Sequence, residues 1–396
     1  MIDAALSYLR GREGAALALL EALVQENSFT DNVAGGIRVG ERLAAELRAI
    51  EGVSSVRAYE STRYAPHWAA RTAAAEGSAA GCVAIVGHLD TVFPPGTFEG
   101  FRREGSIARG PGVLDMKGGL VVVLEALRAL AHVNVLARVP IRVVIVSDEE
   151  VGSPEGQHVI TEELAGASAA LVFEAGRAKD LVITSRKGTG KARVIATGKA
   201  AHAGNGHADG ANAIWALARF VDRAQRLTDY GRGVTVNVGT IRGGQSKNTV
   251  PDQAEAGLDF RYERLADGQA LLAALATAAE EAALPGTTLT VDGSIARSSL
   301  ERTAASAALY EAYAACARAA GLGDGEAPLV GGGSDAATTG ALGIPSIDGL
   351  GPRGSGFHTH EERIEVATLL PKAEAIVRFL LARVPGFDTD GPSRSS

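Results

Sequence analysis

Residues 83–130 decide the fold, and they read VAIVGHLDTVFPPGTFEGFRREGSIARGPGVLDMKGGLVVVLEALRAL. The stretch opens on a short apolar run rich in β-branched residues, which predicts a buried strand. His88 and Asp90 follow this strand, and Asp115 lies between a Gly-rich loop and a helical run. Ligands bind outside the carboxyl ends of strands in open α/β sheets. Because zinc prefers imidazole mixed with carboxylate oxygen, the stretch predicts a metal site.

Two later apolar runs also end in residues that can bind a metal. Residues 140–146 are followed by Glu149 and Glu150, and residues 169–173 are followed by Glu174. If Glu149 and Glu150 continue the strand, their side chains point apart and cannot easily bind the same ion. Three strand ends with such residues are more informative than any one carboxylate, which alone is usually a solvated charge.

The composition limits the function classes. The chain has 396 residues, 46% of them hydrophobic and 21% charged, which predicts two globular domains with a sizeable core. Its formal net charge of -7 argues against a nucleic-acid partner. The two cysteines, Cys82 and Cys316, are interpreted as small buried side chains. The amino-terminal residues suggest neither a signal peptide nor a membrane span, so we expect a cytoplasmic protein without a membrane partner.

The first part of the chain alternates helical and strand patterns. Residues 2–50 show helical spacing in two segments broken at 27–36, and residues 53–60 and 67–72 alternate like strands. A helix is expected over 118–131. The order of apolar runs and helices predicts an α/β fold.

The pattern of predicted strands and helices changes after residue 186. Three segments, 190–197, 234–242 and 254–262, read as strands that can pair antiparallel. Helical segments are expected at 208–227 and 266–283, and the elements suggest a β-α-β-β-α-β order. This order predicts a small two-layer unit inserted into the larger domain. The first architecture resumes near Leu300 with a helix to about 320, a strand at 345–347 and a closing helix over 366–383. The expected domains are therefore 1–185 with 298–387, and 186–297, followed by a flexible tail at 388–396.

These residues resemble a known family. The motifs, in chain order, are His88-Leu-Asp90, Gly110 to Gly119, Asp148-Glu-Glu150, Phe173-Glu174, Ala201-His-Ala-Gly204 and a late His358. They resemble the dizinc aminoacylase/carboxypeptidase family, which includes glutamate carboxypeptidase, acetylornithine deacetylase and succinyl-diaminopimelate desuccinylase, and the branch most similar is glutamate carboxypeptidase. The resemblance implies a zinc-peptidase-like mixed β-sheet flanked by helices, with a smaller inserted dimerisation (lid) domain and a homodimeric assembly.

The resemblance also implies a ligand set for two zinc ions. Asp115 would bridge the two ions, His88 and Glu174 would complete one site, and Glu150 and His358 the other. Such a carboxylate can hold cations about 3.5 to 4 Å apart and lower the pKa of a water between them towards roughly 7. Cobalt or manganese could occupy the same ligands.

The family's general base corresponds to Glu149, which would take the proton of the attacking water and pass it to the leaving nitrogen. Asp90, two residues beyond His88, is expected on the same strand face, where it can accept the second ring N–H of His88 and fix the tautomer. His360 competes with His358 as a ligand, and His358 is preferred because it matches the family position.

Substrate binding is expected from the inserted unit. His202 resembles a family histidine that reaches the partner subunit's active site and polarises the scissile carbonyl, and Asn248 resembles a substrate-binding asparagine. Arg261, Arg297 and the loop with Gly332 and Gly333 are candidates for binding a carboxylate. A surface ion pair is the competing interpretation for either arginine.

Two departures from the family lie in these substrate-facing parts. Arg297-Ser-Ser299 stands where relatives often have Arg-Pro-Pro, and the motif after Gly204 is also changed, which leaves the role of His207 open.

The leading hypothesis is a dizinc amidohydrolase that cleaves N-acyl amino acids or short peptides with a free carboxylate. A biosynthetic deacylase acting on N-acetylornithine or N-succinyl-diaminopimelate is the alternative. A non-catalytic metal-binding dimer is a third hypothesis, against which Glu149 and His202 argue.

Overall fold

The computed structural model describes residues 1–384, so the expected tail at 388–396 lies outside the described residues. The described chain forms two compact units. Unit 1 contains Met1–Thr184, Arg302–Leu329 and the described residues from Ser334 onwards, and unit 2 contains Ser185–Glu301 and Val330–Gly333.

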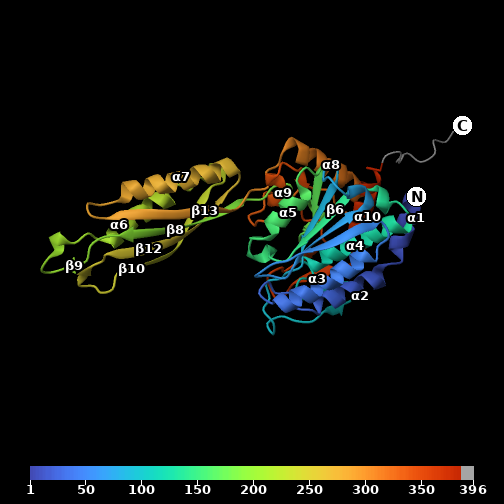
Figure 1. Cartoon of the computed structure of the whole chain (residues 1–396), viewed down its shortest axis with the longest axis horizontal. Coiled ribbons are helices and arrows are strands. Elements are labelled where there is room, and N and C mark those ends of the chain that lie inside the picture. Colours follow the sequence, from blue (N-terminus) through green and yellow to red (C-terminus); the bar gives the residue numbers. More distant parts are fainter. Residues whose placement is uncertain (385–396) are drawn as a thin grey trace. The chain divides into compact units, whose positions relative to one another are not determined.

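A six-stranded mixed sheet forms the centre of unit 1 (Figure 1). Its strands, in spatial order, are β1 (Val53–Tyr59), β2 (His67–Thr72), β6 (Ile141–Val146), β3 (Val83–His88), β7 (Ala169–Val172) and β14 (Ser346–Ile347). β3 pairs in parallel with β6 and β7, and every residue of β3 is buried. A strand covered on both faces has no polar alternation, which explains its continuous apolar run. The expected α/β class with a mixed sheet is confirmed.

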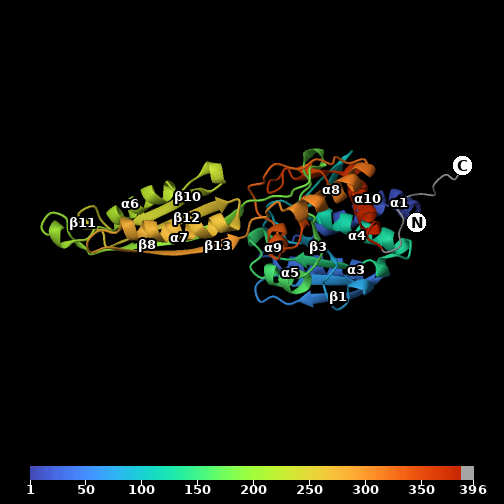
Figure 2. The ribbon, with the colours of Figure 1, turned by 90° about the horizontal axis from the view of Figure 1, so that it is seen from above.

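Helices flank this sheet (Figure 2). They are α1 (Ile2–Arg10), α2 (Glu13–Val24), α3 (Val33–Arg48), α4 (Lys117–His132), α5 (Gly156–Leu164), α8 (Ala304–Ala319), α9 (Ala336–Ala341) and α10 (Leu369–Leu381). The expectation of two amino-terminal helical segments was wrong, because the chain also breaks at Gly11, whose N–H bonds to the carbonyl of Tyr8. α3 begins at Val33 because the Asn32 side chain accepts the N–H of Gly35.

A second, smaller sheet in unit 1 had no signal in the sequence. It joins β4 (Arg102–Glu104) and β5 (Ile107–Arg109) to β15 (Gly354–Ser355) and β16 (Arg363–Glu365), all antiparallel. This pairing brings the segment before Asp115 next to the segment around His358. The two loops therefore meet although they are far apart in the sequence.

Unit 2 is the expected two-layer structure. Its antiparallel sheet has the order β10 (Thr235–Gly243), β12 (Gln253–Tyr262), β8 (Gly188–Thr197) and β13 (Thr288–Arg297), and its helices are α6 (Ala213–Gln225) and α7 (Leu265–Ala282). Buried and exposed residues alternate along β8 and β12, so one face of the sheet packs against the helices. α6 begins at Ala213 rather than 208, because the Asn212 side chain caps it by accepting the N–H of Trp215 at 2.9 Å.

Within residues 1–384, no helix is both long and apolar enough to span a bilayer.

Candidate metal centre

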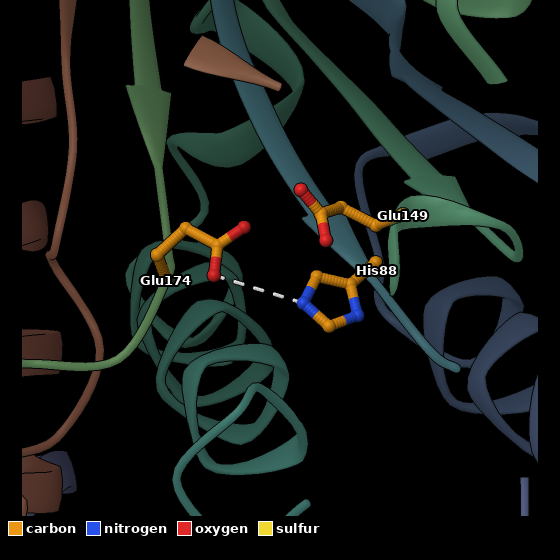
Figure 3. A group of neighbouring side chains, drawn as sticks. All are labelled: His88, Glu149 and Glu174. Carbon is orange, nitrogen blue, oxygen red and sulfur yellow. Dashed lines mark ion pairs between the residues drawn. The ribbon is translucent and has the colours of Figure 1, made fainter. Parts of the chain in front are cut away.

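His88, at the end of β3, lies beside two buried carboxylates. Its Nε2 atom is 3.3 Å from Oδ1 of Asp115 and 3.7 Å from Oε2 of Glu174, the residue that follows β7 by two positions. Figure 3 shows the ring of His88 facing Glu174, with the carboxylate of Glu149 above it. Ligand atoms of His88, Glu149 and Glu174 all lie within 4.8 Å of one another. One imidazole and several carboxylates thus converge at one edge of the sheet.

A second cluster uses the other oxygen of Asp115. Nε2 of His358 is 3.3 Å from Oδ2 of Asp115 and 3.1 Å from Oε2 of Glu150. The His358 side chain is 49% exposed, whereas that of Glu150 is 6% exposed. The centre is therefore buried on the protein side and open on the side of His358, as a site that admits a substrate must be.

The donor set fits a pair of cations. Asp115 directs one oxygen to each imidazole, and each imidazole also meets a second carboxylate. Oε1 of Glu150 is buried and has no hydrogen-bond partner among the described residues. A buried carboxylate oxygen without a donor is costly unless a cation takes its place. The mixture of imidazole and carboxylate is one that zinc accepts.

Glu149 and Glu150 belong to a short 3-10 turn, Glu149–Val151, rather than to a strand. β6 has already ended at Val146. The expectation of consecutive strand residues was therefore wrong, and it is the turn that directs the two side chains. Glu150 lies near His358 and Glu149 near His88 and Glu174.

Asp90 supports both this turn and the ring of His88. The Asp90 carboxylate accepts the backbone N–H groups of Glu149 at 3.2 Å and Glu150 at 3.1 Å, and the Thr30 hydroxyl at 2.8 Å. Nδ1 of His88 is 3.0 Å from the Asp90 backbone carbonyl and 3.4 Å from its carboxylate. β3 ends at His88, so the expected shared strand face was wrong. The backbone carbonyl of Asp90 is the nearer partner of the ring, and the carboxylate mainly holds the turn.

Thr30 was missed in the sequence because it lies in an irregular segment before α3. It is 4% exposed, and its hydroxyl donates to Asp90. A threonine in a loop has no pattern that links it to a carboxylate 60 residues away.

The clustered groups strongly perturb one another. Burial raises the pKa of Glu150 to about 7 and also raises the pKa of Glu174. Burial would raise the pKa of Asp115 too, but hydrogen bonds from His358 and His88 hold it below its usual range. Hydrogen bonds to Asp115 and Glu150 raise the pKa of His358 to about 10. Burial opposes the charge of His88, yet Glu174, Asp115 and Asp90 raise its pKa.

These shifts predict that metal binding releases protons. The pKa of His358, raised to about 10, keeps a proton on its ring at neutral pH in the metal-free protein, and the pKa of His88 is raised in the same direction. A metal binds neutral imidazole, so such protons must leave when it binds. For each displaced proton, the affinity then falls about tenfold per pH unit of acidification. Calorimetric zinc titrations in buffers with different ionisation enthalpies measure the release. An affinity that stayed constant between about pH 6 and pH 8 would contradict this prediction.

His360 lies apart from the clustered ligands. Its ring stacks on Phe98 with centroids 5.4 Å apart and meets Phe93 at 6.0 Å. The geometry therefore favours His358 over His360 beside Asp115.

His202 and Asn248 are brought together in unit 2. A two-stranded ribbon pairs β9 (Ala201–His202) with β11 (Thr249–Val250), and the N–H of Ala203 donates to the carbonyl of Asn248. Nδ1 of His202 accepts the N–H groups of Gly204 and Asn205, each at 3.1 Å. A neutral His202 therefore carries its proton on Nε2, where it can be donated.

The carboxylate-binding candidates also lie in unit 2. Arg261 and Arg297 both stand opposite Thr189 of β8, one on each side. Arg261 forms an exposed ion pair with Asp259 at 2.9 Å, which supports the surface interpretation for this residue. The carbonyl groups of Gly332 and Gly333 accept hydrogen bonds from a guanidinium, that of Arg186.

Comparison with known proteins gives the family. Residues 84–382 match the model of peptidase family M20/M25/M40. The chain is 31% identical over 291 residues to carboxypeptidase G2 of Pseudomonas sp. (strain RS-16), covering 73% of this chain and 70% of that protein. It is 31% identical over 199 residues to acetylornithine deacetylase of Myxococcus xanthus, covering 47% of this chain and 50% of that protein.

The fold is similar to that of solved family members. Aminopeptidase PepT from Bacillus cereus ATCC 10987 gives a TM-score of 0.74 at 23% identity, covering 93% of this chain and 98% of that chain. The matched region contains all five clustered side chains, His88, Asp115, Glu150, Glu174 and His358. The resemblance is confirmed, and the chain belongs to peptidase family M20/M25/M40 and is a metal-dependent hydrolase.

Proposed function

We propose that this hydrolase cleaves the amide bond of N-acyl amino acids or short peptides that carry a free carboxylate, as a glutamate carboxypeptidase does. The observation that carries the proposal is the pair of clusters that share Asp115, with Glu149 beside them. The similarity to carboxypeptidase G2 supports this substrate class, because it extends over more of this chain than the equally identical match to acetylornithine deacetylase.

Two zinc ions are the proposed cofactors, with His88, Asp115 and Glu174 holding one and Asp115, Glu150 and His358 the other. When bound, they polarise the scissile carbonyl and lower the pKa of the attacking water. The same donor set could bind cobalt or manganese. Metal analysis of the purified protein identifies which one it carries.

Glu149 is the proposed general base and acid. Its carboxylate lies within 4.8 Å of ligand atoms on His88 and Glu174, so it can take a proton from the attacking water. The same group then delivers that proton to the nitrogen of the leaving amino acid. Asp90 supports this role by holding the backbone of the Glu149–Glu150 turn.

His202 is the proposed donor to the carbonyl oxygen. Its Nδ1 is occupied by two backbone N–H groups, which leaves the Nε2–H group to stabilise negative charge on that oxygen. We propose that it serves the active site of a partner copy. Asn248, on the neighbouring strand of the ribbon, would bind the substrate near the same atoms.

Arg261, Arg297 and the loop with Gly332 and Gly333 remain proposals for binding the substrate carboxylate. Either arginine could make the principal contact, and Arg261 would have to leave its ion pair with Asp259 to do so. A cytoplasmic location is also a proposal, which the free thiols of Cys82 and Cys316 support.

The test is hydrolysis of a panel of acyl-glutamates, other N-acyl amino acids and dipeptides, with a chelator control. We expect chelator-sensitive turnover that depends on the free carboxylate and is lost with the corresponding amides. Turnover confined to N-acetylornithine or N-succinyl-diaminopimelate would replace the proposal with the deacylase. Two bound metals without turnover on any amide would support a non-catalytic dimer.

We further propose that unit 2 forms a homodimer through its edge strand. β10 lies at one edge of the sheet, and its Ile241 lies near Ile214 of the neighbouring helix α6, which also carries Trp215. Ile241 is 56% exposed, Trp215 61% and Ile214 39%. Unpaired backbone groups and exposed apolar residues at a sheet edge favour pairing with another chain.

Replacing Ile241 with lysine is expected to shift the protein from dimer to monomer, because the new charge would be buried at the interface. Light scattering over a concentration series measures the change. Tyr230→Ala is the matched control, since Tyr230 is 85% exposed in the same unit but lies outside β10. A wild-type protein that is monomeric at assay concentration and fully active would contradict both the dimer and the proposed role of His202.

A further inference from the structure

Glu362 is a buried carboxylate that the proposed chemistry does not use. Glu362 is 1% exposed, and its carboxylate accepts three backbone hydrogen bonds. Oε1 accepts the N–H groups of Leu114 at 2.8 Å and Asp115 at 2.9 Å, and Oε2 accepts that of Gly112 at 3.0 Å. The loop that carries the shared carboxylate is therefore wrapped around the side chain of Glu362.

The backbone of Glu362 is tied to the turn that carries His358. The N–H of Glu362 donates to the carbonyl of Thr359, and the N–H and hydroxyl of Thr359 both donate to the carbonyl of Gly356. His358 itself has a φ of 61°, a left-handed conformation that surrounding contacts must maintain in a non-glycine residue. Glu362 thus belongs to the His358 turn through its backbone and to the Asp115 loop through its side chain.

Glu362 and the buried Lys117, the first residue of α4, influence each other's charge. Burial lowers the pKa of Lys117 to about 7, and the charge of Glu362 opposes that shift. Burial raises the pKa of Glu362 to about 7, and the three backbone N–H groups oppose that shift. The Nζ atom of Lys117 donates to the carbonyl of Glu26 at 2.9 Å, which fixes its position. A buried carboxylate whose oxygens accept three backbone N–H groups is satisfied and can anchor the loop that supplies them.

We propose that Glu362 is a positioning residue that couples the Asp115 loop to the His358 turn and so sets the spacing of the cation site formed by Asp115, Glu150 and His358. This inference rests on the proposed metal ligands. Glu362 holds two of the three ligands of that site, Asp115 and His358. Of the ligands of the other site, it holds only Asp115. Loss of the carboxylate should therefore weaken the site with His358 more than the site with His88.

The test compares Glu362→Gln with Glu361→Gln. Glutamine preserves the size of Glu362 but places an N–H₂ group against at least one backbone N–H, so the three-bond anchor is lost. Glu361 is the matched control, because its side chain is 73% exposed and forms an ion pair with Arg109. Each protein is stripped of metal and titrated with zinc against a competing chelator, and the metal-free forms are unfolded in urea.

In Glu362→Gln we expect the zinc dissociation constant of the site with His358 to rise about 10- to 100-fold, the loss usual when a partner of a metal ligand is removed. Glu361→Gln should behave like the wild type. Activity lost by Glu362→Gln should return at high zinc concentration, because the ligands themselves are intact. A zinc affinity unchanged by Glu362→Gln, whatever its effect on unfolding, would overturn the proposal.

The same substitution in a His358→Ala background shows whether Glu362 acts by coupling the Asp115 loop to the His358 turn or by stabilising the whole metal centre. Only the site with His88 remains there, and we expect its affinity to fall by less than about fivefold, below the usual range for a lost supporting contact. An equal loss in both backgrounds would overturn the coupling of the two loops. Glu362→Asp, which keeps the charge but withdraws the carboxylate, undergoes the same titrations with the same two outcomes if Glu362→Gln does not fold. Because zinc binding is read directly, an inactive wild-type protein would refute the proposed function without affecting this test.

Discussion

Replacing Glu149 with glutamine is expected to lower kcat by about 10²- to 10⁴-fold, the contribution typical of a positioned general acid–base group. The amide cannot take a proton from the attacking water or return one to the leaving nitrogen. The proposed metal ligands are untouched, and the backbone N–H of residue 149 can still donate to Asp90. The two metal ions and the KM of the best substrate should therefore change little.

Steady-state kinetics together with metal analysis on the same sample check this expectation. Glu155→Gln is a matched control, because Glu155 lies six positions further on, with a side chain that is 37% exposed. Full turnover by the Glu149 variant would refute the assigned role. Loss of a metal ion together with activity would instead indicate that Glu149 is a ligand, which its closeness to His88 and Glu174 makes a meaningful alternative.

The main sheet was predictable because its strands are marked locally. β3 is buried along its whole length and paired on both sides, so its sequence is continuously apolar. The residues that follow β3, β6 and β7 meet at one edge because parallel strands end there together. Strand position thus indicated that His88, the Glu149–Glu150 pair and Glu174 follow strand ends, whereas the family resemblance selected the ligands among them.

The details of the centre were less predictable because they depend on contacts between distant segments. Glu362 bonds the N–H of Asp115 across 247 positions, and no local pattern distinguishes it from the exposed Glu361 beside it. The turn at Glu149 follows a strand without Gly or Pro to mark the boundary. Its shape is imposed by the Asp90 carboxylate, a contact across 59 positions that periodicity cannot reveal.

Replacing Asp115 with asparagine is expected to remove both metal ions, whereas His358→Ala should remove one. Each oxygen of Asp115 faces a different cluster, Oδ1 that of His88 and Oδ2 that of His358. The amide is neutral and presents only one oxygen, so neither cluster keeps its shared anionic ligand. Loss of a group that merely supports a ligand costs about 10- to 100-fold in affinity, and loss of a shared ligand should cost more at both sites.

Equilibrium dialysis followed by metal analysis distinguishes the two variants. Asparagine has nearly the size of aspartate, and the N–H of residue 115 can still donate to Glu362, so the metal-free fold should persist. Two ions bound to the Asp115 variant with wild-type affinity would show that the carboxylate does not bridge them. Loss of only one ion would place Asp115 in a single site, and the centre would then be two independent sites rather than one binuclear unit.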